Sequence, residues 1–153
     1  MSLLVFIALV FIAALSGAIF RPGDWYEGLR KPSWNPPNWM FPTVWTALYA
    51  MIAAAGWIVW QEAGLGLAIG LWGLQLVLNA AWSVFFFGMR RMDLAFFEVC
   101  LLWLSIAAFM GVALPISPLA AGLFVPYLVW VTIAAALNLS VWRMNPGAEA
   151  TAQ

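Results

Sequence analysis

Histidine is absent from this chain, and cysteine occurs only once, at Cys100. A single cysteine excludes a disulfide bond within the chain, and the lack of histidine excludes a metal site of the usual His/Cys kind. The same absence excludes a Ser-His-Asp triad, and the sequence offers neither paired carboxylates nor a thiolate beside a base. We therefore expect no metal, no obligatory cofactor and no conventional hydrolase.

Charged residues are scarce as well, at 8% of the chain against ~25% in an ordinary soluble domain. The six basic and six acidic residues cancel, and no cluster of lysine or arginine indicates nucleic-acid binding. Hydrophobic residues reach 66% and the mean hydropathy is +0.98, so lipid rather than water is the expected solvent. In lipid the backbone must pair internally, and long unbroken apolar runs favour helices over a closed barrel.

Five apolar runs approach the ~20 residues that a membrane-spanning helix needs. They lie at about residues 3–20, 41–61, 66–87, 93–114 and 119–143. We expect an all-α fold, a five-transmembrane-helix bundle that forms a single domain over residues 1–153. The first run could be misread as a signal peptide, with cleavage near Ser16 as the alternative, but no basic residue precedes it.

The basic residues all fall in segments that share one side of this bundle. They are Arg21, Arg30 and Lys31 in the first loop, Arg90 and Arg91 in the third, and Arg143 after the last helix. The positive-inside rule then places the first and third loops and the C-terminus in the cytoplasm. An outer membrane uses another insertion route, so the choice between inner and outer membrane stays open.

One face of the run at 66–87 carries small residues, Gly66, Gly70 and Gly73, in line with Val77 at ~100° per residue. Small residues let helix backbones approach closely, and in lipid this van der Waals contact drives helix association. The glycines predict either contact with another helix of the same chain or the seam of a homodimer.

The opposite face of the same run carries Gln75, Asn79 and Trp82. Polar side chains within a membrane span need partners, so hydrogen bonds between helices could account for the two amides without a ligand. The alternative is that this face lines a binding site.

Two other runs present matching surfaces at helical spacing. These residues are Trp45 and Tyr49 in the second run, and Tyr127, Trp130, Ala134 and Asn138 in the last. If the three faces meet, they enclose an apolar pocket with indole walls and a few amides, which suits a flat, largely apolar ligand. The other reading of tryptophan is an aromatic belt at the membrane interface, which accounts for most of the 11 tryptophans.

The first loop, residues 21–40, combines prolines and glycines with four aromatic residues, including Trp25 and Tyr26. The run Asn35-Pro36-Pro37 fixes backbone torsions and reduces the entropy lost on ordering. We expect an ordered lid over the mouth of the bundle. The alternative is a loop that rests among lipid headgroups.

Glu98 is a carboxylate within the fourth run, about 8 Å along the helix from Asp93 at 1.5 Å per residue. Intramembrane acids can couple transport to protons. We favour a simpler account, in which Glu98 snorkels to the interface or pairs with an arginine.

Six motifs follow one another along the chain in the pattern of a known family. They are Lys31-Pro32-Ser33-Trp34-Asn35-Pro36-Pro37, Pro42-x-x-Trp45-Thr46-x-Leu48-Tyr49, Gln75-Leu76-x-Leu78-Asn79-x-x-Trp82, Phe86-Phe87-Gly88, Pro126-Tyr127-Leu128-x-Trp130 and Leu137-Asn138-x-x-Val141-Trp142-Arg143. Over almost its whole length the sequence closely resembles the tryptophan-rich sensory protein and translocator protein family, TspO/MBR.

This resemblance implies a five-helix membrane protein, commonly a homodimer, that binds porphyrins such as protoporphyrin IX in a cavity covered by the first loop. By position, Tyr26, Trp45, Asn79, Trp130 and Ala134 would line that cavity. Some bacterial members promote light-dependent porphyrin breakdown, and the resemblance assigns that photochemical role to Trp45 or Trp130.

Eukaryotic members bind cholesterol through a segment that contains a tyrosine, where this chain has Leu139 and Ser140. The segment fails the sterol pattern, which argues against a steroidogenic role, and the reversed pattern that starts at Arg21 is too loose to restore it. We expect an integral multi-pass protein of bacterial type that binds tetrapyrroles as a sensor or carrier. The alternatives are a proton-coupled small-molecule exporter that uses Glu98, and an enzyme that degrades porphyrin.

Overall fold

The computed structural model describes residues 2–19, 24–37 and 39–146. Its elements are α1 (Leu3–Ile19), α2 (Asp24–Glu27), α3 (Met40–Ala63), α4 (Leu67–Ser83), η1 (Val84–Gly88), α5 (Met92–Ala113), α6 (Pro118–Leu123) and α7 (Val125–Met144). The described residues contain no strand, which confirms the all-α fold class.

Four helical stretches are long and apolar enough to cross a membrane. They are Met40–Ala63, Leu67–Gly88, Met92–Ala113 and Pro118–Met144. The remaining long helix, α1, has 17 residues and is apolar but shorter. The arrangement is broadly that of the expected five-helix bundle, with helix ends shifted by a few residues from the expected positions.

Local chemistry explains two irregular turns. Pro126 follows the short helix α6 and cannot donate a backbone hydrogen bond, so the chain interrupts the helix at Phe124 before it resumes as α7. At the other end of the bundle, α4 widens into the π-helical turn η1, where the N–H of Met89 donates to the carbonyl of Val84 over 2.7 Å.

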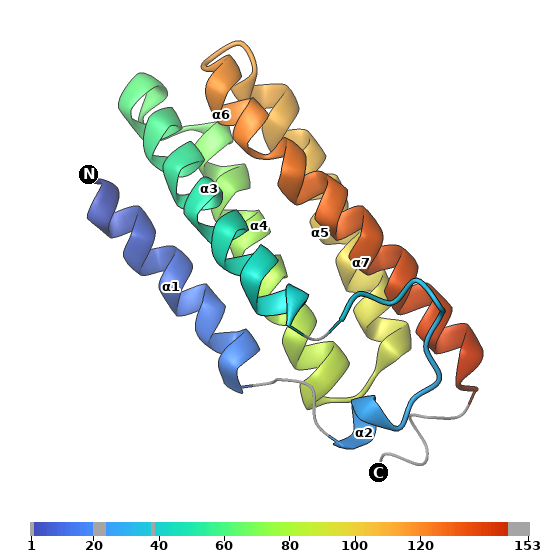
Figure 1. The fold of residues 1–153 in the computed structure, drawn as a ribbon. Coiled ribbons are helices and arrows are strands. Elements are labelled where there is room, and N and C mark those ends of the chain that lie inside the picture. The colour runs from blue at the N-terminus through green and yellow to red at the C-terminus, as the bar shows by residue number, and fades with distance from the viewer. Residues whose placement is uncertain (1, 20–23, 38, 147–153) are drawn as a thin grey trace.

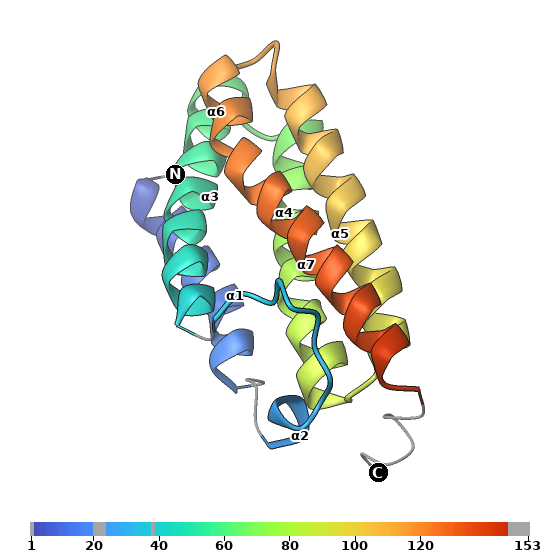
Figure 2. The same ribbon diagram turned by 45° about the vertical axis from the view of Figure 1, so that its right-hand side comes forward.

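The helices run antiparallel, so the connections alternate between the two ends of the bundle (Figure 1). The segment α2, the turn after η1 and the C-terminal end of α7 lie together at one end, whereas α6 lies at the other (Figures 1 and 2). The first end therefore gathers the basic residues Arg30, Lys31, Arg90, Arg91 and Arg143, while Arg21 lies outside the described residues.

The packing ties α5 to α4 and α7, and ties α1 to α3 and α4. Trp72 of α4 joins three helices, because its Nε1 donates to the carbonyl of Ile52 in α3 over 2.8 Å and its ring meets Phe6 of α1 edge-on at 5.2 Å. Between α3 and α7 the link is aromatic, since Phe41 and Trp45 both contact the ring of Trp130 edge-on.

Candidate functional site

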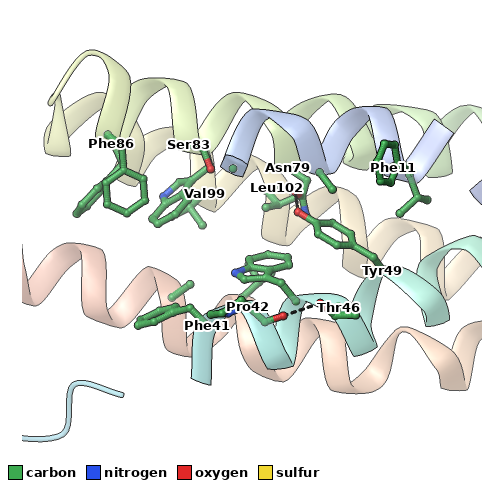
Figure 3. Close-up of a pocket in the computed structure, with 18 of the residues that line it drawn as sticks. Phe11, Phe41, Pro42, Thr46, Tyr49, Asn79, Ser83, Phe86, Val99 and Leu102 are labelled. Atoms are coloured by element: carbon green, nitrogen blue, oxygen red, sulfur yellow. Dashed lines mark hydrogen bonds between the residues drawn. The ribbon is translucent and has the colours of Figure 1, made fainter. Parts of the chain in front are cut away.

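A cavity of about 1120 Å³ lies among the helices, and side chains from α1 through α7 except α6 line it (Figure 3). Its lining is mostly apolar. From α1 come Leu3, Ile7, Val10, Phe11, Ala14 and Gly17; from α2, Tyr26 and Glu27; from α3, Phe41, Pro42, Trp45, Thr46, Tyr49, Ala50, Ala53 and Ala54; from α4 and η1, Asn79, Trp82, Ser83, Phe86 and Phe87; from α5, Val99 and Leu102; and from α7, Val131, Ala134, Leu137 and Asn138.

Two stacked aromatic pairs form opposite parts of the lining. Trp45 and Tyr49 of α3 lie with ring centroids 5.4 Å apart and planes at 27°. Trp82 of α4 and Phe86 of η1 lie 5.1 Å apart, also at 27°. Figure 3 shows Phe86 on the α4 side of the cavity and Tyr49 reaching across from α3 toward Asn79. The cavity thus offers flat π-surfaces on both sides.

A buried chain of hydrogen bonds supports the α4 side of the wall. Tyr49 donates to Oδ1 of Asn79 over 3.3 Å, and Nδ2 of Asn79 donates to the hydroxyl of Tyr127 over 2.8 Å. Tyr127 donates to Oε1 of Gln75 over 2.8 Å, and Nε2 of Gln75 donates to the carbonyl of Trp72 over 2.7 Å. The chain satisfies the amides of α4 within the protein and leaves Tyr49 at its cavity end.

A second polar link holds the part of the wall nearest η1. Nε1 of Trp82 donates to Oδ1 of Asn138 over 3.1 Å, and Nδ2 of Asn138 donates to the carbonyl of Met92 over 2.9 Å. The link fixes the indole of Trp82 against α7 and uses its N–H within the protein.

Tyr26 and Glu27 of α2 contribute to the lining of the cavity. Tyr26 is buried, with ring centroids 6.0 Å from Phe86 and 5.5 Å from Phe87, and Nζ of Lys31 lies 4.5 Å from its ring centroid. Burial, and secondarily the charge of Glu27, raises the pKa of Tyr26 to about 12, so its hydroxyl is neutral at physiological pH.

Asn145 anchors this loop to the end of α7. The backbone N–H of Arg30 donates to Oδ1 of Asn145 over 2.8 Å, and Nδ2 of Asn145 donates to the carbonyls of Arg30 and Val141, each over 2.8 Å. Two segments 115 residues apart in the sequence are therefore joined.

The structure brings most of the sequence-predicted site residues to the cavity and leaves three behind its wall. Tyr26, Trp45, Tyr49, Asn79, Trp82, Ala134 and Asn138 line it. Gln75, Tyr127 and Trp130 do not line it. Tyr127 is fully buried and bonds to Asn79, Gln75 is fully buried and bonds to Tyr127, and Trp130 meets the Trp45 ring edge-on at 6.5 Å. These three support the lining from behind.

Sequence reasoning missed the contribution of α1. Phe11 and its neighbours Ile7 and Ala14 line the cavity, although the only polar side chain of α1 is that of Ser16, which donates to the carbonyl of Ala80 over 2.8 Å. A polar stripe, the signal that revealed the α4 face, is missing there. Only the packing of α1 against α3 and α4 shows which side of it faces inward.

The expectation for Glu98 was wrong. Its side chain neither snorkels nor pairs with an arginine: it is 6% exposed, and both carboxylate oxygens lack a hydrogen-bond partner among the described residues. Arg91 instead binds Asp93, with Nε and Nη2 donating over 3.0 and 2.8 Å. Seven residues, about two helical turns, separate Glu98 from Arg91 at the start of α5, which puts the carboxyl out of reach of that arginine.

Across the described parts of the chain, no group of three His, Cys, Asp or Glu side chains is placed to hold a metal ion. What the site offers chemically is therefore aromatic stacking, apolar contact and a few hydrogen bonds from fixed polar groups.

The sequence matches the model of the TspO/MBR family over residues 4–143. It is 45% identical over 141 residues to protein CrtK of Rhodobacter capsulatus, covering 88% of this chain and 87% of that protein. It is also 42% identical to the tryptophan-rich sensory protein of Cereibacter sphaeroides, covering 93% and 90%, and 41% identical to the translocator protein of Homo sapiens, covering 86% and 82%.

Proposed function

Because the chain belongs to the TspO/MBR family of membrane proteins, we propose that it binds tetrapyrroles of the protoporphyrin IX type within the bilayer, as a sensor or carrier. The names of its relatives, tryptophan-rich sensory protein and translocator protein, support a role in membrane sensing or translocation. The main support for this class of ligand is the cavity of about 1120 Å³ between two stacked aromatic pairs. This volume lies just above the roughly 300–1,000 Å³ of ordinary ligand pockets, which suits a large flat molecule.

The proposal includes a secondary photochemical activity, light-dependent oxidative breakdown of the bound porphyrin. Trp45 is the better-placed indole, since it lines the cavity, and Trp130 lies behind it in edge contact. In this proposal the first loop serves as the lid of the site, anchored by Asn145, and the end of the bundle that gathers the basic residues faces the cytoplasm.

Replacing Trp45 with phenylalanine is expected to weaken protoporphyrin IX binding by ~0.5–1.5 kcal/mol, the scale of one aromatic stacking term. Trp130→Phe should weaken it less, because Trp130 does not line the cavity and acts through its contacts with Trp45 and Phe41. Quenching of tryptophan fluorescence, titrated in darkness and under illumination, measures both variants.

Trp34→Phe is the matched control for this titration, since Trp34 is 49% exposed and lies outside the cavity lining. Equal affinity in the parent and in both Trp45→Phe and Trp130→Phe would contradict the stacked-indole site. Illumination should change the porphyrin absorption spectrum in the parent faster than in Trp45→Phe.

We also propose that the protein is a homodimer joined through the glycine stripe of α4. A Cβ atom built on Gly66, Gly70 or Gly73 meets no other atom within 4 Å in the described structure. Val77, in line with them, is 67% exposed. Contact with another helix of the same chain, the alternative reading of these glycines, is therefore not formed, and the stripe is free to meet a second copy.

The second candidate function is a proton-coupled small-molecule exporter. It is favoured by one observation, the buried and unpartnered carboxyl of Glu98, because intramembrane acids carry protons in pumps and transporters. It ranks second because the neighbours Val99 and Leu102 line the cavity while Glu98 does not. The chain also lacks the inverted repeats that many transporters show.

We expect no pH-driven porphyrin uptake by vesicles that contain the parent protein, with a Glu98→Gln variant behaving identically. Uptake is measured as fluorescence of protoporphyrin IX inside vesicles after a pH step, with protein-free vesicles as the control. Robust uptake by the parent that Glu98→Gln abolishes would reverse the order of the two candidates.

A further inference from the structure

The hydrogen-bond chain behind the cavity has a single direction. Its far end is the backbone carbonyl of Trp72, which can only accept, so the group of Gln75 that faces it over 2.7 Å must be the amide N–H. This orientation turns Oε1 of Gln75 toward Tyr127, which must then donate its hydroxyl proton to that oxygen over 2.8 Å. The backbone thus fixes the orientation of the first two members.

The same logic continues to the cavity. Since the Tyr127 proton is used on Gln75, the Tyr127 oxygen accepts from Nδ2 of Asn79 over 2.8 Å. Asn79 therefore turns Oδ1 toward Tyr49, and Tyr49 must donate its only hydroxyl proton to that oxygen. A network with every donor aligned in this way is cooperative and resists reversal of a single member.

The consequence falls on Tyr49, the member of the chain that lines the cavity from α3. Its hydroxyl proton is committed inward, so toward a ligand this oxygen can only accept a hydrogen bond. We propose that the cavity selects flat apolar ligands that carry a hydrogen-bond donor, and that the Tyr49 oxygen accepts the hydrogen bond from this donor. This inference rests on the proposed function. A ligand whose polar group can only accept would leave that group unpaired against Tyr49, which costs affinity.

Thr46 also lines the cavity, and its hydroxyl donates to the carbonyl of Pro42 over 2.7 Å, so toward a ligand its oxygen likewise accepts. The two indoles of the lining do not supply this selection. The N–H of Trp82 is used on Asn138, whose own amide is oriented by the Met92 carbonyl. Trp45, which also lines the cavity, makes no hydrogen bond through its indole N–H in the described structure, so it can donate to any ligand oxygen. A pair of probes that share an oxygen but differ in one proton, compared between the parent and a Tyr49→Phe variant, therefore isolates the contribution of Tyr49.

The probes are 1-hydroxypyrene and 1-methoxypyrene, two flat aromatic molecules of nearly equal shape, of which only the first can donate. Each is titrated into the full-length protein in one mild detergent, with energy transfer from tryptophan as the signal. We expect the parent to prefer the hydroxyl probe by about 3- to 10-fold more than Tyr49→Phe does, the scale of one neutral hydrogen bond. Comparing parent with variant cancels the different partitioning of the two probes into detergent.

Gln75→Met gives a readout that a merely structural role would not produce. Without the Gln75 oxygen, Tyr127 must donate to Asn79, the Asn79 amide turns over, and the Tyr49 proton is released toward the cavity. We expect this variant to shift the probe preference toward 1-methoxypyrene relative to the parent. Because Gln75 is fully buried and this variant could fail to fold, Tyr49→Phe keeps the test decisive by itself.

Equal probe preference in the parent and Tyr49→Phe would overturn the inference, and so would a folded Gln75→Met variant with the parental preference. Protoporphyrin IX is titrated on the same preparations. Normal porphyrin binding with no probe selectivity would contradict only the role of Tyr49. Absence of porphyrin binding in the parent would contradict the proposed function itself.

Discussion

Gly56→Ala is expected to destabilise the folded protein by about 1–3 kcal/mol, the usual cost of overpacking a core. A Cβ atom at position 56 would lie closer than 3.0 Å to three atoms of the Trp72 indole, a separation that real Cβ atoms essentially never show. The indole has no room to withdraw, because it donates to the Ile52 carbonyl and packs against Phe6. The added methyl must therefore push α3 away from α4.

Thermal unfolding followed by circular dichroism measures this effect, and Gly111→Ala is the matched control. Position 111 lies in a helix too and outside the proposed dimer seam, and a Cβ there meets nothing within 4 Å. Replacing glycine with alanine in a helix is favourable when space allows, so the control should match or exceed the parental melting temperature. Equal melting temperatures for Gly56→Ala and the parent would show that the contact between α3 and Trp72 is not tight.

The bundle and one wall of its cavity could be predicted from the sequence because both leave a periodic signal. Apolar runs bounded by Gly and Pro mark the long helices, which end within a few residues of the expected positions. On α4, the amides of Gln75 and Asn79 stand out in an apolar run at helical spacing, so the residue pattern alone identifies the inward face. Both are buried, as that periodicity indicates.

Other features of the site depend on packing that no local pattern records. The inward side of α1 has one polar residue, Ser16, rather than a polar stripe, and the depth of Trp130 behind Trp45 is set by how α3 meets α7. The anchor between Arg30 and Asn145 joins residues far apart in the sequence, and a lone asparagine after a helix gives no hint of its partner. Tertiary contacts of this kind are visible only in the assembled fold.

Glu98 shows the limit of reasoning from element position alone. The position of Glu98 along its helix predicts how deep it lies in the membrane. Whether its carboxyl finds a partner depends on which residues the neighbouring helices place against it. The five described basic residues gather at one end of the bundle. Arg91, the basic residue nearest to Glu98 in the sequence, caps α5 and binds Asp93. A buried acid without a counter-charge follows from this arrangement.

The proposed dimer predicts that Gly70→Leu converts the protein to monomers in mild detergent. Apolar burial drives little association in lipid, so two copies of α4 hold together where glycines allow close van der Waals contact. A leucine at position 70 would point into open space on the outside of one protomer and hold its partner away. The protomer itself should stay folded and keep its porphyrin site, because the cavity lies on the opposite face of α4.

Asn79→Leu is the reciprocal variant, since Asn79 lines the cavity and joins Tyr49 to Tyr127. Its loss should weaken protoporphyrin IX binding by about 1–3 kcal/mol, the cost of leaving buried polar partners unsatisfied, and leave the dimer intact. Light scattering gives the oligomeric state, and ligand titration on the same preparations gives the affinity. Should Gly70→Leu remain dimeric while it loses the porphyrin, the glycine stripe would belong to the ligand side of α4 and the two faces would be exchanged.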